Sequence, residues 1–382
     1  MTQKLFDLDG TLLEFDAKVL TCTRMEDGFA VTLDKTAFAP EGGGQRSDVG
    51  ILGEATVLDV RTDGDTILHI VDRALSEGSA VRGFVDEERR VRHIQNHTGE
   101  HIVSGLFHTL YGYQNIGFHL GSEDVTMDLD GEVSEEMLRL VEREANRVVY
   151  ENHPVTVSYP TAEALATLSY RAKLELSENV RIVTVEGVDA CACCAPHVAR
   201  TGQIGMIKLI FAIRYKGGTR IHMKCGFDAL DEFNAEFTRA TAISNRISLP
   251  RERIAEGVEK LWADLAEANY KLVGLRRELI ACKADAAQAT AGNLLFIEKG
   301  MDTNDLRLLV TGAMARAGGA CAAFSPAESG EYYFVATYSG EDFDGWKKRL
   351  CDTLRGHGGG KAPFIQGKAN CTEEDIRRFF EA

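Results

Sequence analysis

The sequence predicts an α+β protein of several domains, because three kinds of pattern follow one another along its 382 residues. Short β-branched runs come first, a helical pattern with paired histidines follows, and a heptad pattern precedes a final mixed stretch. A chain of this length also exceeds one ordinary hydrophobic core. We therefore expect a small β-barrel, an α+β domain, a long helical linker and a C-terminal α/β domain, over residues 1–88, 89–240, 241–290 and 291–382.

The first part is expected to be a barrel because apolar, β-branched runs alternate with turn signals such as Asp27-Gly28 and Asp63-Gly64-Asp65. The runs are Ala17–Thr23, Phe29–Leu33, Ala55–Val60, Thr66–Val71 and Ala80–Val85. Residues 36–50 interrupt them with three consecutive glycines. Such glycines permit either a tight turn or a close approach of the backbone to a ligand. Both interpretations stay open.

The segment FDLDGTLL at 6–13 resembles the D-x-D-G-T signature of haloacid-dehalogenase-like phosphatases, in which Asp7 would be the nucleophile and Asp9 the acid/base. That family needs a buried strand before the motif and a helix after it. Here only six residues precede Asp7, and the residues that follow alternate like a strand. We do not expect a phosphatase.

The strongest chemical signal is a pair of histidines, His97 and His101, in a stretch whose apolar positions fit one side of a helix. Both imidazoles then leave the same face one turn apart. A histidine pair alone is more often a helix surface, but the cluster CACCAPH at 191–197 repeats the four-residue spacing in Cys193 and His197. Thiolate and imidazole are the ligands that zinc prefers. The two pairs therefore predict one Zn²⁺ per chain.

The rest of the second part mixes helices and strands. Ser134 is expected to cap a helix that continues to about residue 152, and Val180–Val185 is expected to be a strand that leads into the Cys/His cluster. Met206–Tyr215 is a further predicted strand.

The linker carries a heptad seam, with spacings of four and three that alternate throughout. Its positions are Ile254, Val258, Leu261, Leu265, Ala268, Leu272, Leu275, Leu279 and Cys282. We expect one long helix that packs along this seam, in an antiparallel hairpin or in a homodimer through residues 254–282. A single amphipathic helix on a globular core is the alternative.

The last part is expected to be an α/β domain with three strands and three helices. The predicted strands are Leu294–Ile297, Ala320–Phe324 and Tyr332–Thr337, and the predicted helices are Asn304–Ala317, Asp342–Leu354 and Thr372–Phe380. The glycine-rich stretch at 355–369 fails as a nucleotide P-loop, because Ala362 stands where Ser or Thr would bind magnesium. Its backbone, with Lys361 and Lys368, is either a phosphate contact or a structural turn.

Composition limits the location and the partners. The chain is 44% apolar and 26% charged, as in soluble globular proteins, and no apolar run reaches membrane-spanning length. Residues 1–10 hold two aspartates where a signal peptide needs an apolar core, so we expect a cytoplasmic protein with nine reduced cysteines and no membrane partner. The net charge of −15 means that any RNA contact must use local basic patches.

Four motifs occur in one order: PEGGGQ, HTGEH, C-x3-H followed by VARTGQIG, and GGGKAPFIQGKA. Together they resemble the alanyl-tRNA editing proteins in their long form with a C-terminal DHHA1-type domain, without the synthetase part. The resemblance implies a zinc-dependent hydrolase that removes serine or glycine from tRNA(Ala), with the DHHA1-like domain holding the tRNA. It also implies a ligand set of His97, His101, Cys193 and His197.

The family's C-G-G-T-H reads C-C-A-P-H here, so Cys194 and Cys191 compete with Cys193 as the thiolate. Four protein ligands usually describe a closed structural site, so catalysis requires a weak ligand or a fifth position. Glu100, between the histidines, is the candidate base or a solvent-facing residue. Gln45 and Thr36 are expected to hydrogen-bond the serine hydroxyl, because a polar group left unpaired by alanine costs ~1–3 kcal/mol.

Two other functions remain. HTGEH also fits H-x-x-E-H, the inverted zincin motif of metallopeptidases, with Glu175 or Glu178 as the third ligand. That interpretation leaves the other three motifs unexplained. A non-enzyme alternative is a tRNA-binding or dimer scaffold in which the zinc is structural.

Overall fold

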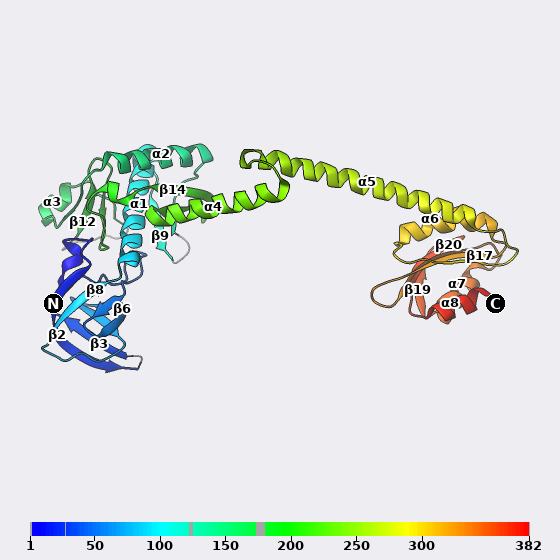
Figure 1. Cartoon of the computed structure of the whole chain (residues 1–382), viewed down its shortest axis with the longest axis horizontal. Helices are drawn as coiled ribbons and strands as arrows, with labels where there is room; N and C mark the ends of the chain where they lie inside the picture. Colours follow the sequence, from blue (N-terminus) through cyan, green and yellow to red (C-terminus); the bar gives the residue numbers. More distant parts are fainter. Residues whose placement is uncertain (1, 27, 122–124, 173–179, 382) are drawn as a thin grey trace. The chain divides into compact units, whose positions relative to one another are not determined.

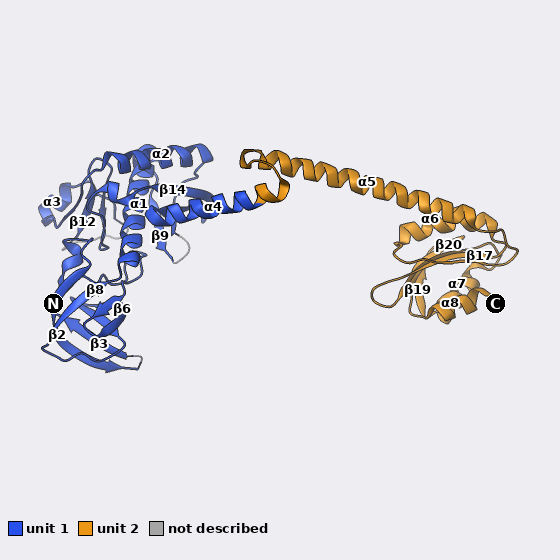
Figure 2. Cartoon of the chain, viewed as in Figure 1, with its two compact units in different colours: residues 1–242 blue, residues 243–382 orange. Residues whose placement is uncertain are grey.

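The computed structural model describes every residue except 1, 27, 122–124, 173–179 and 382. The chain forms two compact units, residues 1–242 and 243–382 (Figure 2). Helices and sheets occur in both units (Figure 1), so the expected mixed multidomain class is confirmed. Among the described residues, no helix is both long enough and apolar enough to cross a bilayer.

The first unit begins with strands that close on one another in the order β2-β3-β7-β6-β5-β8. They are β2 (Glu14–Met25), β3 (Gly28–Leu33), β5 (Gly50–Leu52), β6 (Ala55–Asp63), β7 (Thr66–Val71) and β8 (Ala80–Val85). The long strand β2 pairs with β3 at one end and with β8 at the other, which closes the ring. All five predicted runs are strands. Strand β5 was missed because three residues are too few to show alternation.

The D-x-D-G-T segment has a different structure from that of a phosphatase. The strand before it, β1 (Gln3–Lys4), has two residues and pairs with β4 (Lys35–Thr36), and Asp7 ends the 3-10 turn Leu5–Asp7. Strand β2 follows where a helix is needed. The carboxylate of Asp7 accepts a hydrogen bond from Tyr159 at 2.9 Å. It is therefore part of a structural contact.

The helix α1 (Glu87–Tyr111) carries the paired histidines of the first unit and buries most of its residues. Asp86 caps its start by accepting from the N–H of Arg89, and Gly112, at φ 74°, ends it. The helix packs on an antiparallel sheet of order β14-β15-β10-β9. Gly99 permits this contact, because a Cβ there would lie 2.3 Å from Sγ of Cys225 in β15.

That sheet contains β9 (Asn115–Leu120), β10 (Val125–Leu129), β14 (Ile207–Tyr215) and β15 (Gly218–Cys225). Helix α2 (Glu135–Glu151) covers the same core, and Ser134 accepts from the N–H of Met137 as expected for its cap. A second sheet joins β11 (Val155–Ser158), β12 (Ile182–Val185) and β13 (Asp189–Ala192), with α3 (Ala162–Thr167) and the 3-10 turn Thr201–Ile204 beside them in sequence.

Helix α4 (Gly226–Ile247) crosses the boundary between the units, and α5 (Ile254–Ala286) follows after the 3-10 turn Arg251–Arg253. The predicted long helix is thus confirmed, although the sequence did not reveal α4 as a separate helix. Ile280 and Ala284, near the end of α5, are buried in a cluster with residues of α6 (Thr303–Ala313). The seam residues before them are mostly exposed.

The second unit also holds a sheet of order β16-β17-β18-β20-β19. Its elements are β16 (Leu294–Ile297), β17 (Ala320–Pro326), β18 (Tyr332–Tyr338), α7 (Phe343–Thr353), β19 (Gly356–Gly359), β20 (Phe364–Ala369) and α8 (Glu373–Glu381), with the 3-10 turn Met314–Arg316 after α6. The predicted strands and helices are confirmed. The glycine-rich stretch is a β-hairpin, β19–β20, in which Lys368 lies 3.6 Å from Glu331.

Candidate active site

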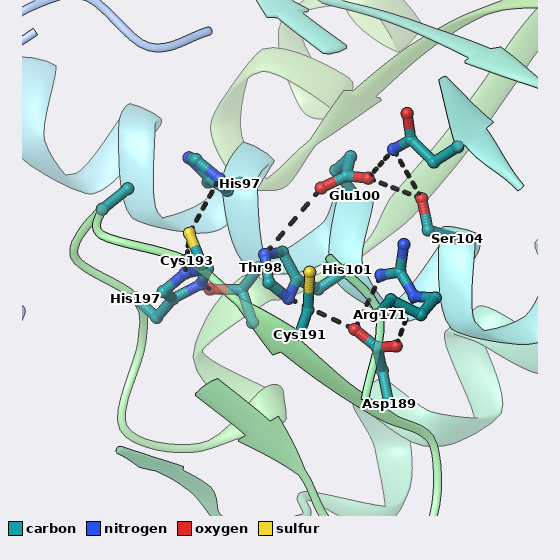
Figure 3. A network of polar contacts seen from close by, with 12 residues as sticks. His97, Thr98, Glu100, His101, Ser104, Arg171, Asp189, Cys191, Cys193 and His197 are labelled. Carbon is teal, nitrogen blue, oxygen red and sulfur yellow. Dashed lines mark hydrogen bonds and ion pairs between the residues drawn. The ribbon is translucent and has the colours of Figure 1, made fainter. Parts of the chain in front are cut away.

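Four side chains of the first unit gather at one point (Figure 3): His97 and His101 from α1, and Cys193 and His197 from the loop after β13. Their candidate ligand atoms all lie within 4.8 Å of one another. The three histidines are buried and Cys193 is partly buried. Two segments about a hundred positions apart in sequence therefore converge as the paired spacings required.

The loop that carries Cys193 is fixed by a buried guanidinium. Nη1 of Arg181 donates to the carbonyl oxygens of Cys193 and Ala195 at 2.8 and 2.9 Å. Gly10 packs closely against the same loop, since a Cβ at this position would lie 2.3 Å from the carbonyl oxygen of His197. The N-terminal segment thus holds the loop in place.

The imidazoles of His97 and His197 are each oriented by a hydrogen bond at Nδ1. Nδ1 of His97 lies 2.9 Å from Oε1 of Gln45, and an amide oxygen only accepts, so His97 donates there. Nδ1 of His197 lies 3.1 Å from Oγ1 of Thr98. The Nε2 atoms then face Sγ of Cys193, at 3.5 Å from His97 and 3.4 Å from His197. Such partners fix which nitrogen is left for a metal.

His101 is oriented by a carboxylate. Its Nδ1 lies 3.3 Å from Oδ2 of Asp189. Arg171 holds that carboxylate with two hydrogen bonds, from Nε at 2.7 Å and from its terminal nitrogen at 2.8 Å. A carboxylate behind a ligating histidine is a common arrangement in zinc sites.

The electrostatics of the cluster favour a negative charge on the sulfur of Cys193. Burial raises the pKa of the Cys193 thiol, but the imidazoles of His97 and His197 outweigh it and hold this pKa well below its usual value. Burial lowers the pKa of His197 to about 3. For His101, burial lowers the pKa, while Asp189 and Cys193 raise it well above 6.5. These directions favour a Cys193 thiolate beside a protonated His101, and a bound metal ion would replace that proton.

This donor set fits zinc. Three imidazole nitrogens and one thiolate are a tetrahedral zinc-ligand combination. The partners at Nδ1 leave Nε2 of His97 and His197 facing the sulfur. The residues present therefore agree with the metal that the spacing predicts.

Glu100 lies beside this cluster and is only 4% exposed, so the solvent-facing interpretation is wrong. Its Oε1 accepts from Oγ of Ser104 at 2.5 Å and from Nδ2 of Asn115. Its Oε2 lies 4.0 Å from Nε2 of His101. One carboxylate oxygen is thus held by the fold, and the other faces a candidate ligand.

The glycine-rich loop reaches the cluster through Gln45 and Gly43, since a Cβ at Gly43 would lie 3.5 Å from the ring of His97. Thr36 is fully buried, and its Oγ1 lies 2.8 Å from Nε2 of His69 and accepts from the N–H of Phe38. The contact of Gln45 with His97 was not foreseen from the sequence. The substrate contacts of Gln45 and Thr36 stay predictions.

Residues 180–222, which include the Cys/His loop, match the family described as "Threonyl and Alanyl tRNA synthetase second additional domain". An alanine–tRNA ligase of Pyrococcus furiosus is 36% identical over 293 residues, which is 73% of this chain and 32% of the ligase. The chain thus spans about a third of the length of the ligases that it matches.

Two further relatives match over most of their own length. "Alanyl-tRNA editing protein Aarsd1-A" of Xenopus laevis is 29% identical over 90% of this chain and 85% of its own. "Alanyl-tRNA editing protein AlaX-L" of Pyrococcus horikoshii is 28% identical over 75% of this chain and 73% of its own. The chain is similar over most of its length to the alanyl-tRNA editing proteins. The resemblance inferred from the four motifs is confirmed.

Among solved structures, the C-Ala domain of Aquifex aeolicus alanyl-tRNA synthetase aligns with 23% of this chain and 87% of that domain. The identity is 20% and the TM-score is 0.21.

The two cysteines that compete with Cys193 as the thiolate ligand occupy different places. Cys194 is exposed, next to Cys193. Cys191 is buried and forms a second group with His101 and Asp189, again within 4.8 Å. Cys193 is the cysteine that lies with all three histidines. Burial raises the pKa of Cys191, which disfavours its thiolate.

The metallopeptidase interpretation cannot be followed to its third ligand, because Glu175 and Glu178 lie outside the described residues. In the described part of the chain, a cysteine and a third histidine complete the group around His97 and His101. That combination differs from the two histidines and one distal glutamate of an inverted zincin.

Proposed function

We propose that this protein is a zinc-dependent hydrolase that removes serine or glycine from wrongly charged tRNA(Ala). The observation that carries the proposal is the convergence of His97, His101, Cys193 and His197 on one point. The similarity to the alanyl-tRNA editing proteins supports the substrate class. The scissile bond is the ester between the amino acid and the terminal ribose.

The four converging residues would hold one Zn²⁺, which supplies Lewis acidity to polarise an ester carbonyl or to lower the pKa of a bound water towards ~7. The protein's own side chains position the ester and move a proton. We assign the proton of the attacking water to Oε2 of Glu100, the oxygen that Ser104 and Asn115 leave unengaged.

We assign selection against alanine to Gln45 and Thr36. Gln45 approaches the cluster directly, since it already contacts His97. The Thr36 hydroxyl would exchange its contact with His69 for the serine hydroxyl. A polar site left unpaired by the methyl of alanine costs ~1–3 kcal/mol, which is about tenfold to a hundredfold in rate.

The other parts of the chain have supporting roles in this proposal. The C-terminal unit, as a DHHA1-like domain, holds the body of the tRNA, and α5 joins two copies through residues 254–282. We place the activity in the cytoplasm. The four-part division, with a barrel at 1–88 and a catalytic domain at 89–240, is kept as a functional division within the two observed units.

The test is a deacylation assay with the purified full chain after zinc loading. We expect release of serine or glycine from Ser-tRNA(Ala) or Gly-tRNA(Ala), and at least about tenfold slower release of alanine from Ala-tRNA(Ala). Cys193→Ala should abolish the release, and Cys194→Ala should retain it. Release no faster than in buffer at micromolar protein would contradict the proposal.

One observation favours a second candidate, a scaffold in which the zinc is structural. All four candidate ligands come from the protein, as in closed structural sites. In that case the protein binds one zinc and binds tRNA, Cys193→Ala lowers the unfolding midpoint, and no substrate is hydrolysed. The same assay therefore separates the two functions.

A further inference from the structure

A cavity of about 350 Å³ lies beside the first two turns of α1, outside the metal cluster. Its basic lining comes from Arg46 in the glycine-rich loop and from Arg89, Arg92 and His93 on the helix. The remaining lining residues are Val49, Asp86, Glu88, Leu120 and Gly121. The volume is at the lower end of ligand-pocket sizes and accommodates a phosphodiester with part of its sugar.

The arginines differ in how they are engaged. Arg92 is held by Asp228, with Nε 2.7 Å from Oδ2. Nε of Arg89 donates to the carbonyl oxygen of Ser47 at 2.9 Å. Within the described residues, neither Arg46 nor Arg89 makes an ion pair with a carboxylate, so two guanidinium groups keep donors for an anion.

The two acidic residues of the cavity, Asp86 and Glu88, offset the positive charge of the arginines to different extents. The carboxylate of Asp86 is engaged in capping the helix, where it accepts from the N–H of Arg89. Glu88 is exposed at the helix start. The start of a helix also contributes partial positive charge of its own.

His93 gives an independent indication of a missing partner. It is only 3% exposed, yet its Nδ1 makes no hydrogen bond, and the nearest carboxylate oxygen, Oδ1 of Asp48, lies 3.9 Å away. Burial and, after it, the charges of Arg89, Arg92 and Arg90 together lower the pKa of His93 to about 3, so the ring lies in positive surroundings. A buried polar atom without a partner is uncommon unless a ligand or water supplies one.

The same helix, α1, and the same glycine-rich loop contribute residues to this cavity and to the surroundings of the metal cluster. His93 lies four residues, about one helical turn, before His97 on α1, a rise of about 6 Å. Arg46 follows Gln45, whose Oε1 holds His97, and the N–H of Leu120 donates to Gly44 in the same loop. If the aminoacyl ester at the end of an RNA chain enters the cluster, the phosphate of the same terminal nucleotide must lie close to the cluster as well.

We infer that this cavity binds the last phosphodiester of the tRNA acceptor end, through Arg46, Arg89 and His93. The inference rests on the proposed function, because it assumes that the ester of a charged tRNA enters the metal cluster. A loss of positive charge from the cavity then weakens RNA binding and leaves the zinc ligands untouched.

The test measures binding of an uncharged RNA microhelix that ends in CCA, by fluorescence anisotropy with the zinc-loaded full chain. Two RNAs are compared, one natural and one with an uncharged methylphosphonate at the last linkage. Wild type should bind the natural RNA about tenfold more tightly, as for one charge-assisted contact. The double variant Arg46→Ala, Arg89→Ala should bind both RNAs equally. The slope of its log binding constant against log salt concentration should be smaller in magnitude by about 0.7 per lost phosphate contact.

Arg143→Ala is the matched control, because this arginine of α2 is also on the surface, with its side chain 74% exposed, and is far from the cavity in sequence. It should keep the full preference for the charged linkage. Zinc content and unfolding midpoint of all variants should equal wild type. If the double variant and wild type discriminate equally between the two RNAs, the phosphate site is wrong. The proposed hydrolase function is not affected by that result, because the assay measures binding and not hydrolysis. Absence of RNA binding by wild type would overturn the phosphate site together with the tRNA assignment.

Discussion

The two long helices of this chain depart from the usual burial pattern in different ways: α1 buries many polar residues, and α5 exposes large apolar ones. Fifteen of the 25 residues of α1 are buried, and histidines, Glu100 and Arg90 are among them. In α5, three of 33 residues are buried, while large apolar side chains such as Leu265 and Leu272 are about 60% exposed. Ordinary globular helices bury apolar residues and expose polar ones. Buried polar groups therefore indicate chemistry in α1, and exposed apolar groups indicate a partner for α5.

The largest expected effect is the loss of a candidate zinc ligand in α1 or its facing loop. Cys193→Ala leaves three imidazoles without the thiolate, so zinc affinity should fall more than about a hundredfold, which exceeds the effect of changing a residue that only hydrogen-bonds a ligand. Mass spectrometry of the native protein and a competing chelator measure this. The exposed Cys194→Ala and the buried Cys191→Ala should keep the metal; if Cys191→Ala loses it instead, the thiolate is misassigned.

The next effect concerns Arg90, which is fully buried in α1. Its guanidinium pairs with Asp48 and donates to the carbonyl oxygens of Ala37 and Gly10, so one side chain joins the helix, the glycine-rich loop and the N-terminal segment. Arg90→Met leaves Asp48 charged and unpaired, and should cost ~3–5 kcal/mol of unfolding free energy. Urea titration measures it. The pair Arg61–Asp59 is the comparison: the Arg61 side chain is 59% exposed, so Arg61→Ala should cost less than about 1 kcal/mol.

Arg90 also shows where prediction from the sequence ends. The spacing of His97 and His101 was visible because both lie on one helix, and the strands of the barrel were visible from their alternation. The partners of those histidines were not, because Gln45, Thr98 and Asp189 meet them only after folding. A pattern in the sequence shows the periodicity of side chains within one helix or strand. It does not show which side chains of different elements come into contact.

The same limit explains the elements that were missed. The hairpin β19–β20 was expected as a turn, because its glycines mark turns in general, and β5 is too short to show a period. Helix α4 carries Phe227, Leu230 and Phe233 at helical spacing, yet these residues are exposed and the helix crosses the boundary between units. The boundary expected at residue 240 falls inside it.

The unfolding free energy should also depend on pH through His69 in the barrel, by an amount similar to the effect of Arg90→Met. Burial lowers the pKa of His69 to about 4, and its ring is held between Thr36 and the carbonyl oxygen of Val31. The folded state thus binds fewer protons than the unfolded state between pH 6.5 and about 4. Stability from this group is complete above pH 6.5 and decreases as the pH falls through that window, by ~3 kcal/mol in all. His69→Gln should flatten the curve of unfolding free energy against pH; an unchanged curve would contradict this.

A smaller effect is expected from Asp189→Asn, which removes the charge behind His101 and keeps the size of the side chain. Zinc affinity should fall about tenfold to a hundredfold, because outer partners orient ligands and raise their basicity. Chelator competition at fixed pH measures the change. Asp128→Asn is the control, since Asp128 is also held by two hydrogen bonds from an arginine, Arg220, but away from the cluster. Equal zinc affinity in both variants would remove Asp189 from the site.

The smallest effect on folding, and the sharpest test of the comparison, concerns α5. Leu265 and Leu272 are exposed in the single chain, so changing both to Glu should alter the unfolding free energy of the monomer by no more than about 0.5 kcal/mol each. If a second copy covers the seam, the same change places charge inside an apolar interface and should convert a dimer to a monomer in light scattering. Ala266→Glu adds charge beside the seam and should leave the dimer intact. A wild-type monomer at all concentrations would show that α5 exposes its leucines for some other partner.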